Sequence, residues 1–340
     1  MRVGIIGCGY WGSKHVRVMA GIPGVQVTAI DASASRLDAI SSTFGPVVKL
    51  AQRLSDELRS LDAVVVATPP ETHFTTAAEA ILAGKHVLVE KPLATSSFEA
   101  LRLVEMADAA GIVLMVGHTF VYNPAVEYLR EIVQSGDLGR IYHVDTARLN
   151  LGLYQQNVDV VWDLAPHDLS IIGRVLGRDP VTVRAWGGKY AHHRFHDVAY
   201  LQLDYGGIGA QVHLSWLEPR KVRRVTVVGS SKMAVYNDLA DDDRLRIYDK
   251  GVTPPVDPEQ LHAVPATYRN GGIVSPYVPF EEPLLLEDLD FVRAIDTGSL
   301  PLASGPSGVN VVRVLEAASL ALDTGDTVEL ALPVGEGLIA

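Results

Sequence analysis

The fold is decided by the segment Val3-Gly4-Ile5-Ile6-Gly7-Cys8-Gly9-Tyr10-Trp11-Gly12 near the start of the chain. An apolar run leads directly into Gly-x-Gly-x-x-Gly and then into a helix candidate, and this context makes the glycine pattern informative. The first glycine permits a tight turn, the second lets a pyrophosphate approach the backbone, and the third lets the helix pack closely on the sheet. Amide groups at the helix start would hold the phosphates. The segment therefore predicts a dinucleotide-binding unit of Rossmann type.

The choice of dinucleotide depends on Asp31, which lies 19 residues after Gly12 at the end of the second predicted strand. A carboxylate at this position can accept hydrogen bonds from the adenosine ribose, which favours NAD over NADP. Arg36 leaves two alternatives open, because it could pair with a 2′-phosphate or cover the adenine face. The alternative without a cofactor is a glycine turn with a solvated aspartate, but strand, spacing and acid all agree with the dinucleotide.

The first third of the chain alternates short apolar runs with amphipathic stretches. Strands are predicted at Val3–Ile6, Val25–Ile30, Ala63–Ala67, His86–Val89 and Ile112–Val116. Helices are predicted at Glu71–Ala83 and Ser97–Ala109, the second capped by Ser96 or Ser97. This alternation is typical of βαβ units whose strands are buried on both faces. We therefore expect a doubly wound parallel sheet in a Rossmann domain over residues 1–118.

After Gly117 the pattern changes to alternating segments typical of an antiparallel sheet. Further strands are predicted at Val198–Tyr205, Gly209–Trp216, Val222–Val228 and Lys232–Tyr236, with a hairpin at Gly206-Gly207. Helices are predicted at Pro124–Ser135, Asp163–Leu176, Leu284–Ile295 and Gly308–Leu322, and an extended loop at Pro254–Pro283. The fold class is therefore α/β, with a second α/β domain over residues 119–340.

Composition narrows the class of partner. The 340 residues suffice for two domains, and the net charge of −11 argues against broad binding to nucleic acids or anionic membranes. Cys8 is the only cysteine, which excludes an intramolecular disulfide and a Cys-based zinc site. No apolar run reaches the roughly 18 residues of a membrane-spanning helix, and the run ending at Gly7 is too short for a signal peptide. We expect a cytoplasmic protein with a small-molecule substrate.

Three further segments carry a resemblance to a known family. They are Thr68-Pro69-Pro70 with His73, Glu90-Lys91-Pro92, and Asp163-Leu164-Ala165-Pro166-His167-Asp168. In this order and spacing the chain resembles the Gfo/Idh/MocA family of sugar and polyol dehydrogenases over essentially its whole length. The resemblance implies a nucleotide-binding half followed by an α/β half with a large, open, mostly antiparallel sheet. It also implies that Lys91, Asp163 and His167 form the catalytic group.

The same resemblance implies contacts with NAD and with the substrate. The segment from His118 to Pro124 resembles the domain crossing of the sugar-nucleotide 3-dehydrogenases and 3-ketoreductases of this family. The predicted cofactor-binding residues are Gly7, Gly9, Tyr10, Trp11, Gly12, Asp31, Arg36, Thr68, Pro69, His73, Glu90, Lys91, His118 and Trp162. The predicted substrate-binding residues are Lys91, Asn123, Tyr154, Asp163 and His167. For Trp162 the alternative is a buried tryptophan that only packs.

The residue types agree with the oxidation of an alcohol. A base must remove the hydroxyl proton while hydride leaves the carbon for the nicotinamide, and histidine, with an ordinary pKa of about 6.5, is suited to this. In a helix Asp163 lies one turn before His167, where it can orient the imidazole. The Lys91 ammonium can stabilise a developing alkoxide. Taken singly, His167 could be a helix histidine paired with an acid and Lys91 a surface lysine.

We therefore predict an NAD-dependent dehydrogenase that oxidises a secondary ring hydroxyl, at C3, of a sugar, amino sugar or sugar nucleotide, or that runs the reverse ketoreduction. One alternative is a glycosidase-type member of the family that oxidises C3 transiently with bound NAD. Another is a regulatory dinucleotide-binding protein without turnover. The resemblance also implies a homodimer or homotetramer formed through the exposed face of the antiparallel sheet.

Two other clusters are weaker. His192, His193 and His196 have only Asp197 as a nearby carboxylate, so no metal site is predicted. Arg220-Lys221 with Arg223-Arg224 is either a solvated strand end or a dock for a phosphorylated substrate.

Overall fold

The computed structural model describes residues 1–152, 157–191, 193–253 and 267–330. The chain divides into two compact units. The first comprises Met1–Tyr122 and Glu281–Glu316, and the second comprises Asn123–Phe280 and the described part of Ala317–Leu332. Among the described residues, no helix has the length and apolar character needed to cross a membrane.

The first unit is built on a six-stranded parallel sheet with the strand order β3-β2-β1-β4-β5-β6. The strands are β1 (Arg2–Ile6), β2 (Gln26–Ile30), β3 (Lys49–Ala51), β4 (Ala63–Val66), β5 (His86–Glu90) and β6 (Leu114–Gly117). This order is that of a Rossmann fold. All five predicted strands are present, whereas the three-residue β3 was missed because so short a segment shows no periodicity.

Helices connect these strands and cover the sheet. They are α1 (Tyr10–Ala20), α2 (Ala34–Phe44), α3 (Leu54–Glu57), α4 (His73–Leu82), α5 (Ser97–Ala110), α8 (Pro283–Thr297) and the first part of α9 (Gly305–Thr324), with short 3-10 turns at Gly45–Val47, Leu58–Ser60, Pro70–Thr72 and Thr119–Tyr122. Ser96 caps α5, because its side chain accepts the Glu99 N–H. The central strands are buried on both faces; every residue of β4 is buried.

The late segment Glu281–Glu316 belongs to the first unit rather than to the second, unlike the predicted span 119–340. The physical reason is backbone pairing with β6: the Val116 N–H donates to the Ala303 carbonyl at 2.9 Å. The start of α9 then packs so closely that a Cβ on Gly305 would lie 2.9 Å from the Leu114 side chain. These contacts join residues almost two hundred positions apart, so no local pattern predicts them.

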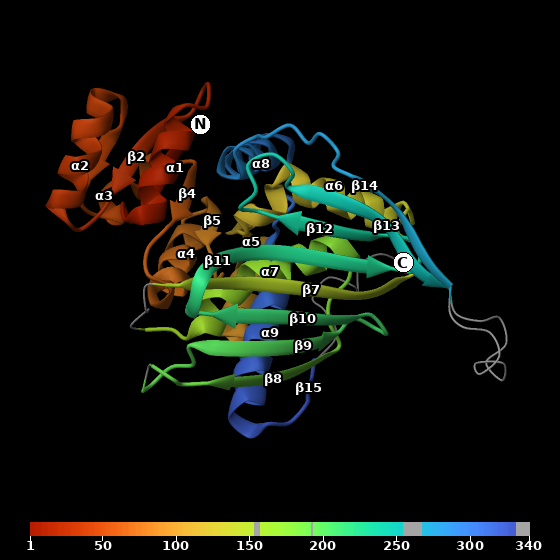
Figure 1. Cartoon of the computed structure of the whole chain (residues 1–340). Helices are drawn as coiled ribbons and strands as arrows, with labels where there is room; N and C mark the ends of the chain where they lie inside the picture. Colours follow the sequence, from red (N-terminus) through yellow and green to blue (C-terminus); the bar gives the residue numbers. More distant parts are fainter. Residues whose placement is uncertain (153–156, 192, 254–266, 331–340) are drawn as a thin grey trace. The chain divides into compact units, whose positions relative to one another are not determined.

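The second unit contains a nine-stranded sheet in the order β14-β13-β12-β11-β7-β10-β9-β8-β15, antiparallel except for the pair β7–β10 (Figure 1). The strands are β7 (Ile141–Leu151), β8 (Thr182–Gly188), β9 (Val198–Asp204), β10 (Gly209–Ser215), β11 (Leu217–Gly229), β12 (Met233–Asn237), β13 (Leu245–Thr253), β14 (Thr267–Val274) and β15 (Val328–Glu329). The helices α6 (Pro124–Gln134) and α7 (Val160–Leu176) pack on this sheet. The predicted hairpin is confirmed, with Gly206 and Gly207 at φ of 67° and 90°.

Two predictions for the second unit need correction. The segment Pro254–Pro283 is not a loop throughout, because Thr267–Val274 forms β14 and pairs with β13. All residues of β14 are exposed, so the strand has no apolar alternation that could reveal it. Residues 254–266 lie outside the described part of the chain. Helix α7 begins at Val160 rather than Asp163, because Asp159 is its N-cap and accepts the N–H groups of Val161 and Trp162, each at 3.0 Å.

Candidate active site

In the glycine turn after β1, there is open space for a side chain at Gly9 and none at Gly12. A Cβ on Gly12 would lie 1.7 Å from the Gly7 carbonyl oxygen, whereas a Cβ on Gly9 would meet no atom within 4 Å. Gly7 has a φ of 87°, which side chains rarely tolerate. Gly9 is the N-cap of α1 and has no side chain that could accept hydrogen bonds from the amide groups at the helix start. This arrangement fits a dinucleotide pyrophosphate over Gly9.

Asp31 ties the end of β2 to this turn. It is 8% exposed, and its carboxylate accepts the Cys8 N–H at 2.7 Å and the Ser33 N–H at 2.8 Å. The Arg36 guanidinium lies 3.4 Å from the same carboxylate. A carboxylate has about four acceptor positions, so capacity for ribose hydroxyls remains. Burial, with the Asp31 charge, raises the pKa of the Cys8 thiol to about 11.

Tyr10 and Trp11 begin α1 beside this turn. Their rings meet edge to face with centroids 5.5 Å apart, and the Lys14 ammonium lies 4.4 Å from the Tyr10 centroid. Tyr10 is 73% exposed. These two predicted cofactor residues thus present an aromatic surface next to a positive charge.

His73 connects the loops that follow β4 and β5. Its Nδ1 lies 2.8 Å from the Pro92 carbonyl oxygen, and its Nε2 lies 2.9 Å from that of Thr68. The ring is 1% exposed, and burial lowers its pKa, although both carbonyls oppose the shift. His73 therefore holds the turn that carries Lys91 against the loop that carries Thr68 and Pro69.

Glu90 and His118 are buried at the ends of β5 and β6. The Glu90 carboxylate lies 3.2 Å from the Nε2 of His15 and accepts the Lys91 N–H at 3.1 Å. Neither ring nitrogen of His118 has a hydrogen-bond partner within the described part of the chain, and burial lowers the pKa of His118 to about 4. His118 is therefore a neutral, unsatisfied hydrogen-bonding group, which a polar ligand could satisfy. The interaction of Glu90 with His15 was not predicted from the sequence.

Helix α7 carries Asp163 and His167 one turn apart in the second unit. The Trp216 indole N–H donates to the Asp163 carboxylate at 3.1 Å, which fixes its orientation. Trp216 is 1% exposed and lies between β10 and β11. Nothing in the sequence singled out Trp216, because the contact joins residues 53 positions apart.

Asp168, the last acid of the motif, anchors α7 to the sheet. Its carboxylate receives two hydrogen bonds from the Arg148 guanidinium on β7, at 2.7 and 3.3 Å. Both side chains are buried. Burial raises the pKa of Asp168, while Arg148 opposes that shift. The pair is structural, and it places Asp163 and His167 by holding their helix.

Three other predicted residues have different outcomes. The Trp162 indole N–H donates to the Ser319 hydroxyl at 3.0 Å, and a contact of its ring with the cofactor stays a prediction. Asn123 is the N-cap of α6, where it accepts the Ala125 N–H at 2.9 Å, and its amide donates to the Tyr236 hydroxyl at 3.0 Å. Its predicted contact with the substrate stays a prediction. Tyr154 lies outside the described residues.

Neither the histidine cluster at residues 192–196 nor the basic segment at residues 220–224 forms a recognisable binding site within the described residues. Within the described residues, no group of three or more His, Cys, Asp or Glu side chains could hold a metal ion. His192 lies outside those residues. Asp197 accepts the N–H groups of Tyr190 and Ala191 at 3.0 and 2.7 Å. In the basic segment, Arg223 pairs with Asp238 at 3.2 Å.

Family models match both halves of the chain. Residues 1–118 match the oxidoreductase family with an NAD-binding Rossmann fold named Gfo/Idh/MocA, and residues 126–235 match the Gfo/Idh/MocA C-terminal domain. The chain is 31% identical over 254 residues to the UDP-N-acetylglucosamine 3-dehydrogenase of Acidithiobacillus ferrooxidans, covering 74% of this chain and 78% of the relative. It is 32% identical over 213 residues to inositol 2-dehydrogenase 2 of Saccharopolyspora erythraea, covering 60% and 63%.

Solved structures agree in fold. The Acidithiobacillus ferrooxidans 3-dehydrogenase GnnA has a TM-score of 0.79 at 27% identity, covering 95% of this chain and 97% of that one. GenD2 from gentamicin A biosynthesis, solved in complex with NAD, has a TM-score of 0.81 at 25% identity, covering 97% and 96%. Both domains match family models, and one relative is 31% identical over 78% of the relative's length. The chain therefore belongs to the Gfo/Idh/MocA oxidoreductase family.

Proposed function

We propose that this protein is an NAD-dependent dehydrogenase that oxidises the C3 hydroxyl of a sugar, amino sugar or sugar nucleotide, or that catalyses the reverse ketoreduction. The observation that carries the proposal is the placement of Asp163 and His167 one turn apart on α7, with Asp163 held by the Trp216 indole. The choice of C3 is supported by the 31% identity to a UDP-N-acetylglucosamine 3-dehydrogenase.

The proposed chemistry divides between binding and proton transfer. Bound NAD supplies the hydride acceptor. Gly9 and the start of α1 hold its pyrophosphate, and Asp31 accepts from its adenosine ribose. His167 accepts the hydroxyl proton, and Asp163 orients the imidazole and stabilises its charged form. Lys91 donates a hydrogen bond to the substrate oxygen and stabilises the developing alkoxide.

Replacing the base tests this assignment. His167→Ala should lower the oxidation rate roughly 10²- to 10⁴-fold and leave NAD affinity nearly unchanged. His193→Ala is the matched control, because His193 is an exposed histidine of the same unit and should retain full activity. A His167→Ala variant that keeps most of its turnover, with Lys91→Ala inactive, would assign the base to the lysine.

An isotopic label tests the carbon. A sugar substrate deuterated at C3 should transfer deuterium to NAD, and it should show a primary isotope effect if the chemical step limits the rate. Deuterium that arrives from C1 or C4, with none from C3, would refute the C3 assignment while leaving the dehydrogenase intact.

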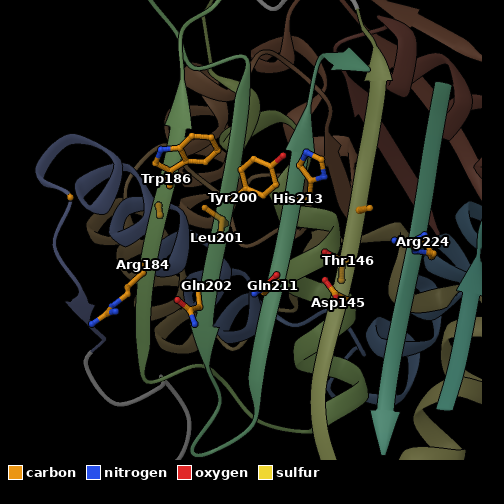
Figure 2. A pocket seen from close by; sticks show the side chains of 13 residues that line it. Asp145, Thr146, Arg184, Trp186, Tyr200, Leu201, Gln202, Gln211, His213 and Arg224 are labelled. Carbon is orange, nitrogen blue, oxygen red and sulfur yellow. The ribbon is translucent and has the colours of Figure 1, made fainter. Parts of the chain in front are cut away.

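We also propose that two copies of the chain assemble through the open face of the nine-stranded sheet. Figure 2 shows Trp186, Tyr200 and His213 side by side on β8, β9 and β10. Tyr200 stacks on His213 with centroids 4.1 Å apart, and Trp186 is 61% exposed. The hollow beside them, about 570 Å³, is also lined by Asp145 and Arg184. Because it carries both charge signs, the face can pair with itself about a two-fold axis.

A double variant tests the assembly. Trp186→Glu with Tyr200→Glu should give a monomer in light scattering after size exclusion, whereas the wild type should be a dimer or tetramer. A variant with the same mass as the wild type would place the interface elsewhere.

A further inference from the structure

A buried polar cluster lies in the first unit at the carboxyl ends of β5 and β6. Its members are His15 on α1, Glu90 at the end of β5, His118 and Thr119 after β6, and Glu287 and Asp288 on α8. His15, Glu287 and Asp288 have no exposed surface, and Glu90 is 6% exposed. Burying so many ionisable groups is costly unless they are paired. The cluster is therefore an arrangement that needs an explanation beyond packing.

His15 is held between two carboxylates. Its Nδ1 lies 2.9 Å from an Asp288 oxygen, and its Nε2 lies 3.2 Å from a Glu90 oxygen. A neutral imidazole donates from one nitrogen only, so two carboxylates on opposite sides of the ring favour its doubly protonated form, although burial also raises the pKa of Asp288. Burial alone would lower the pKa of His15, but Asp288 and Glu90 outweigh it and keep that pKa well above its ordinary value.

The charged groups around His15 come from four segments. Glu90 faces it from the end of β5, where Lys91 lies near Glu90, and Glu287 and Asp288 face it from α8. Burial and the Glu90 charge raise the pKa of Glu287 well above its ordinary value, which favours its protonated form. On its own helix the neighbouring cations are Lys14 and Arg17, and Arg17 pairs with Glu282 just before α8. His118 lies near Glu90 and is neutral.

Glu90 is held at both of its carboxylate oxygens. One carboxylate oxygen receives the imidazole, and the other accepts the backbone N–H of Lys91 at 3.1 Å. Gly117 lies so close that a Cβ there would be 3.1 Å from the second Glu90 oxygen. His73 contacts the Pro92 carbonyl oxygen at 2.8 Å, just after Lys91. The turn that carries Lys91 is thus bound before and after the lysine by two buried histidines.

We propose that His15 is a positioning residue for Lys91: as a cation between Glu90 and Asp288, it fixes the Glu90 carboxylate and, through it, the backbone of the turn that presents the lysine. The inference rests on the proposed function of Lys91. It also gives α8 a function in the site, because Asp288 on this helix contacts the other side of the His15 ring. The two residues are 273 positions apart in the sequence.

The decisive variant removes His15 together with one of its two carboxylate partners, and Glu90 keeps the hydrogen bond from the Lys91 N–H at 3.1 Å. His15→Leu alone strands two buried carboxylates and is expected to unfold the unit, whereas His15→Leu with Asp288→Leu replaces the ion pair by apolar packing, which buried pairs often tolerate. His15→Gln retains one hydrogen-bond donor and serves as the conservative rescue. His86→Leu is the matched control, because His86 lies at the opposite end of β5, where its ring accepts the Val113 N–H at 3.0 Å.

Four measurements separate a positioning role from a purely structural one: ¹⁵N spectra, the melting temperature, the NAD affinity and steady-state kinetics. In the wild type, ¹⁵N spectra of His15 should show a doubly protonated ring from pH 6 to 8. The double variant should melt cooperatively, as a folded protein does, and its NAD affinity should stay within about twofold of the wild-type value. In the same variant, kcat should fall roughly 10- to 100-fold with KM little changed. His15→Gln should recover part of kcat. His86→Leu should keep the wild-type kcat.

A readout that does not depend on turnover keeps this proposal separate from the proposed function. The lysines are reductively methylated with ¹³C-formaldehyde, and the Lys91 signal is assigned with Lys91→Gln. The Lys91 methyl signal should shift in the double variant and not in His86→Leu. An unchanged Lys91 signal, or a neutral His15 ring at pH 7, would overturn the positioning role whatever the sugar activity. A wild type without sugar oxidation but with the expected spectra would refute only the proposed function.

Discussion

Two alanine substitutions in the glycine turn separate folding from cofactor binding. Gly12→Ala places a methyl group 1.7 Å from the Gly7 carbonyl oxygen, where real Cβ atoms do not come within 3.0 Å. Gly9→Ala places the same methyl group where no atom lies within 4 Å. Gly9 also has a φ of −74°, which side chains adopt freely. We therefore expect the first change to damage the fold and the second to damage only NAD binding.

The magnitudes follow from what each methyl group meets. At Gly12 the obstacle is backbone, which cannot rotate away, so the strain should cost roughly 1–3 kcal/mol or more. At Gly9 the free energy of unfolding should change by less than about 0.5 kcal/mol. The methyl group would instead keep a pyrophosphate from the backbone N–H groups. Losing one such charge-assisted hydrogen bond costs roughly 1.5–3 kcal/mol, or about 10- to 100-fold in NAD affinity.

The assay pairs thermal or urea unfolding without cofactor with calorimetric titration by NAD. Gly9→Ala should unfold like the wild type and bind NAD weakly, and Gly12→Ala should be impaired in both measurements. If Gly9→Ala binds NAD as tightly as the wild type does, the pyrophosphate does not approach the backbone at Gly9, and the reasoning from the open space is refuted.

Three further outcomes are expected. NAD should bind at least about tenfold more tightly than NADP in parallel titrations, because a 2′-phosphate would face the Asp31 carboxylate; equal affinities would mean that Arg36 governs the pocket. Arg148→Met should cost roughly 3–5 kcal/mol in urea unfolding, because it leaves Asp168 buried and unpaired, and a loss below about 1 kcal/mol would contradict this. Glu287→Gln should lessen the fall in the free energy of unfolding as pH rises above about 5. A carboxyl with a raised folded pKa holds a proton that the unfolded chain releases, so rising pH destabilises the wild type. Identical slopes of the urea midpoints against pH would refute a raised pKa of Glu287.

The parts of the candidate site that depend on a few neighbouring residues, such as the glycine turn and the α7 motif, could be predicted from the sequence. A β-branched run before three spaced glycines determines a strand, a turn and a helix, because each step depends on backbone conformation within a few residues. The i to i+4 spacing of Asp163 and His167 likewise follows from helical geometry alone. The five strands predicted for the first unit are present for the same reason, since apolar runs buried on both faces are visible in the sequence.

What the sequence by itself determined was therefore the Rossmann class, the glycine turn and the identity of the candidate catalytic side chains. Only the tertiary structure decided what holds those side chains in place: the Trp216 contact with Asp163, the cation at His15 and the return of α8 to the first unit. The reason is physical. These contacts join residues 53 to 273 positions apart, and they depend on burial and on hydrogen-bond direction, neither of which appears in local periodicity.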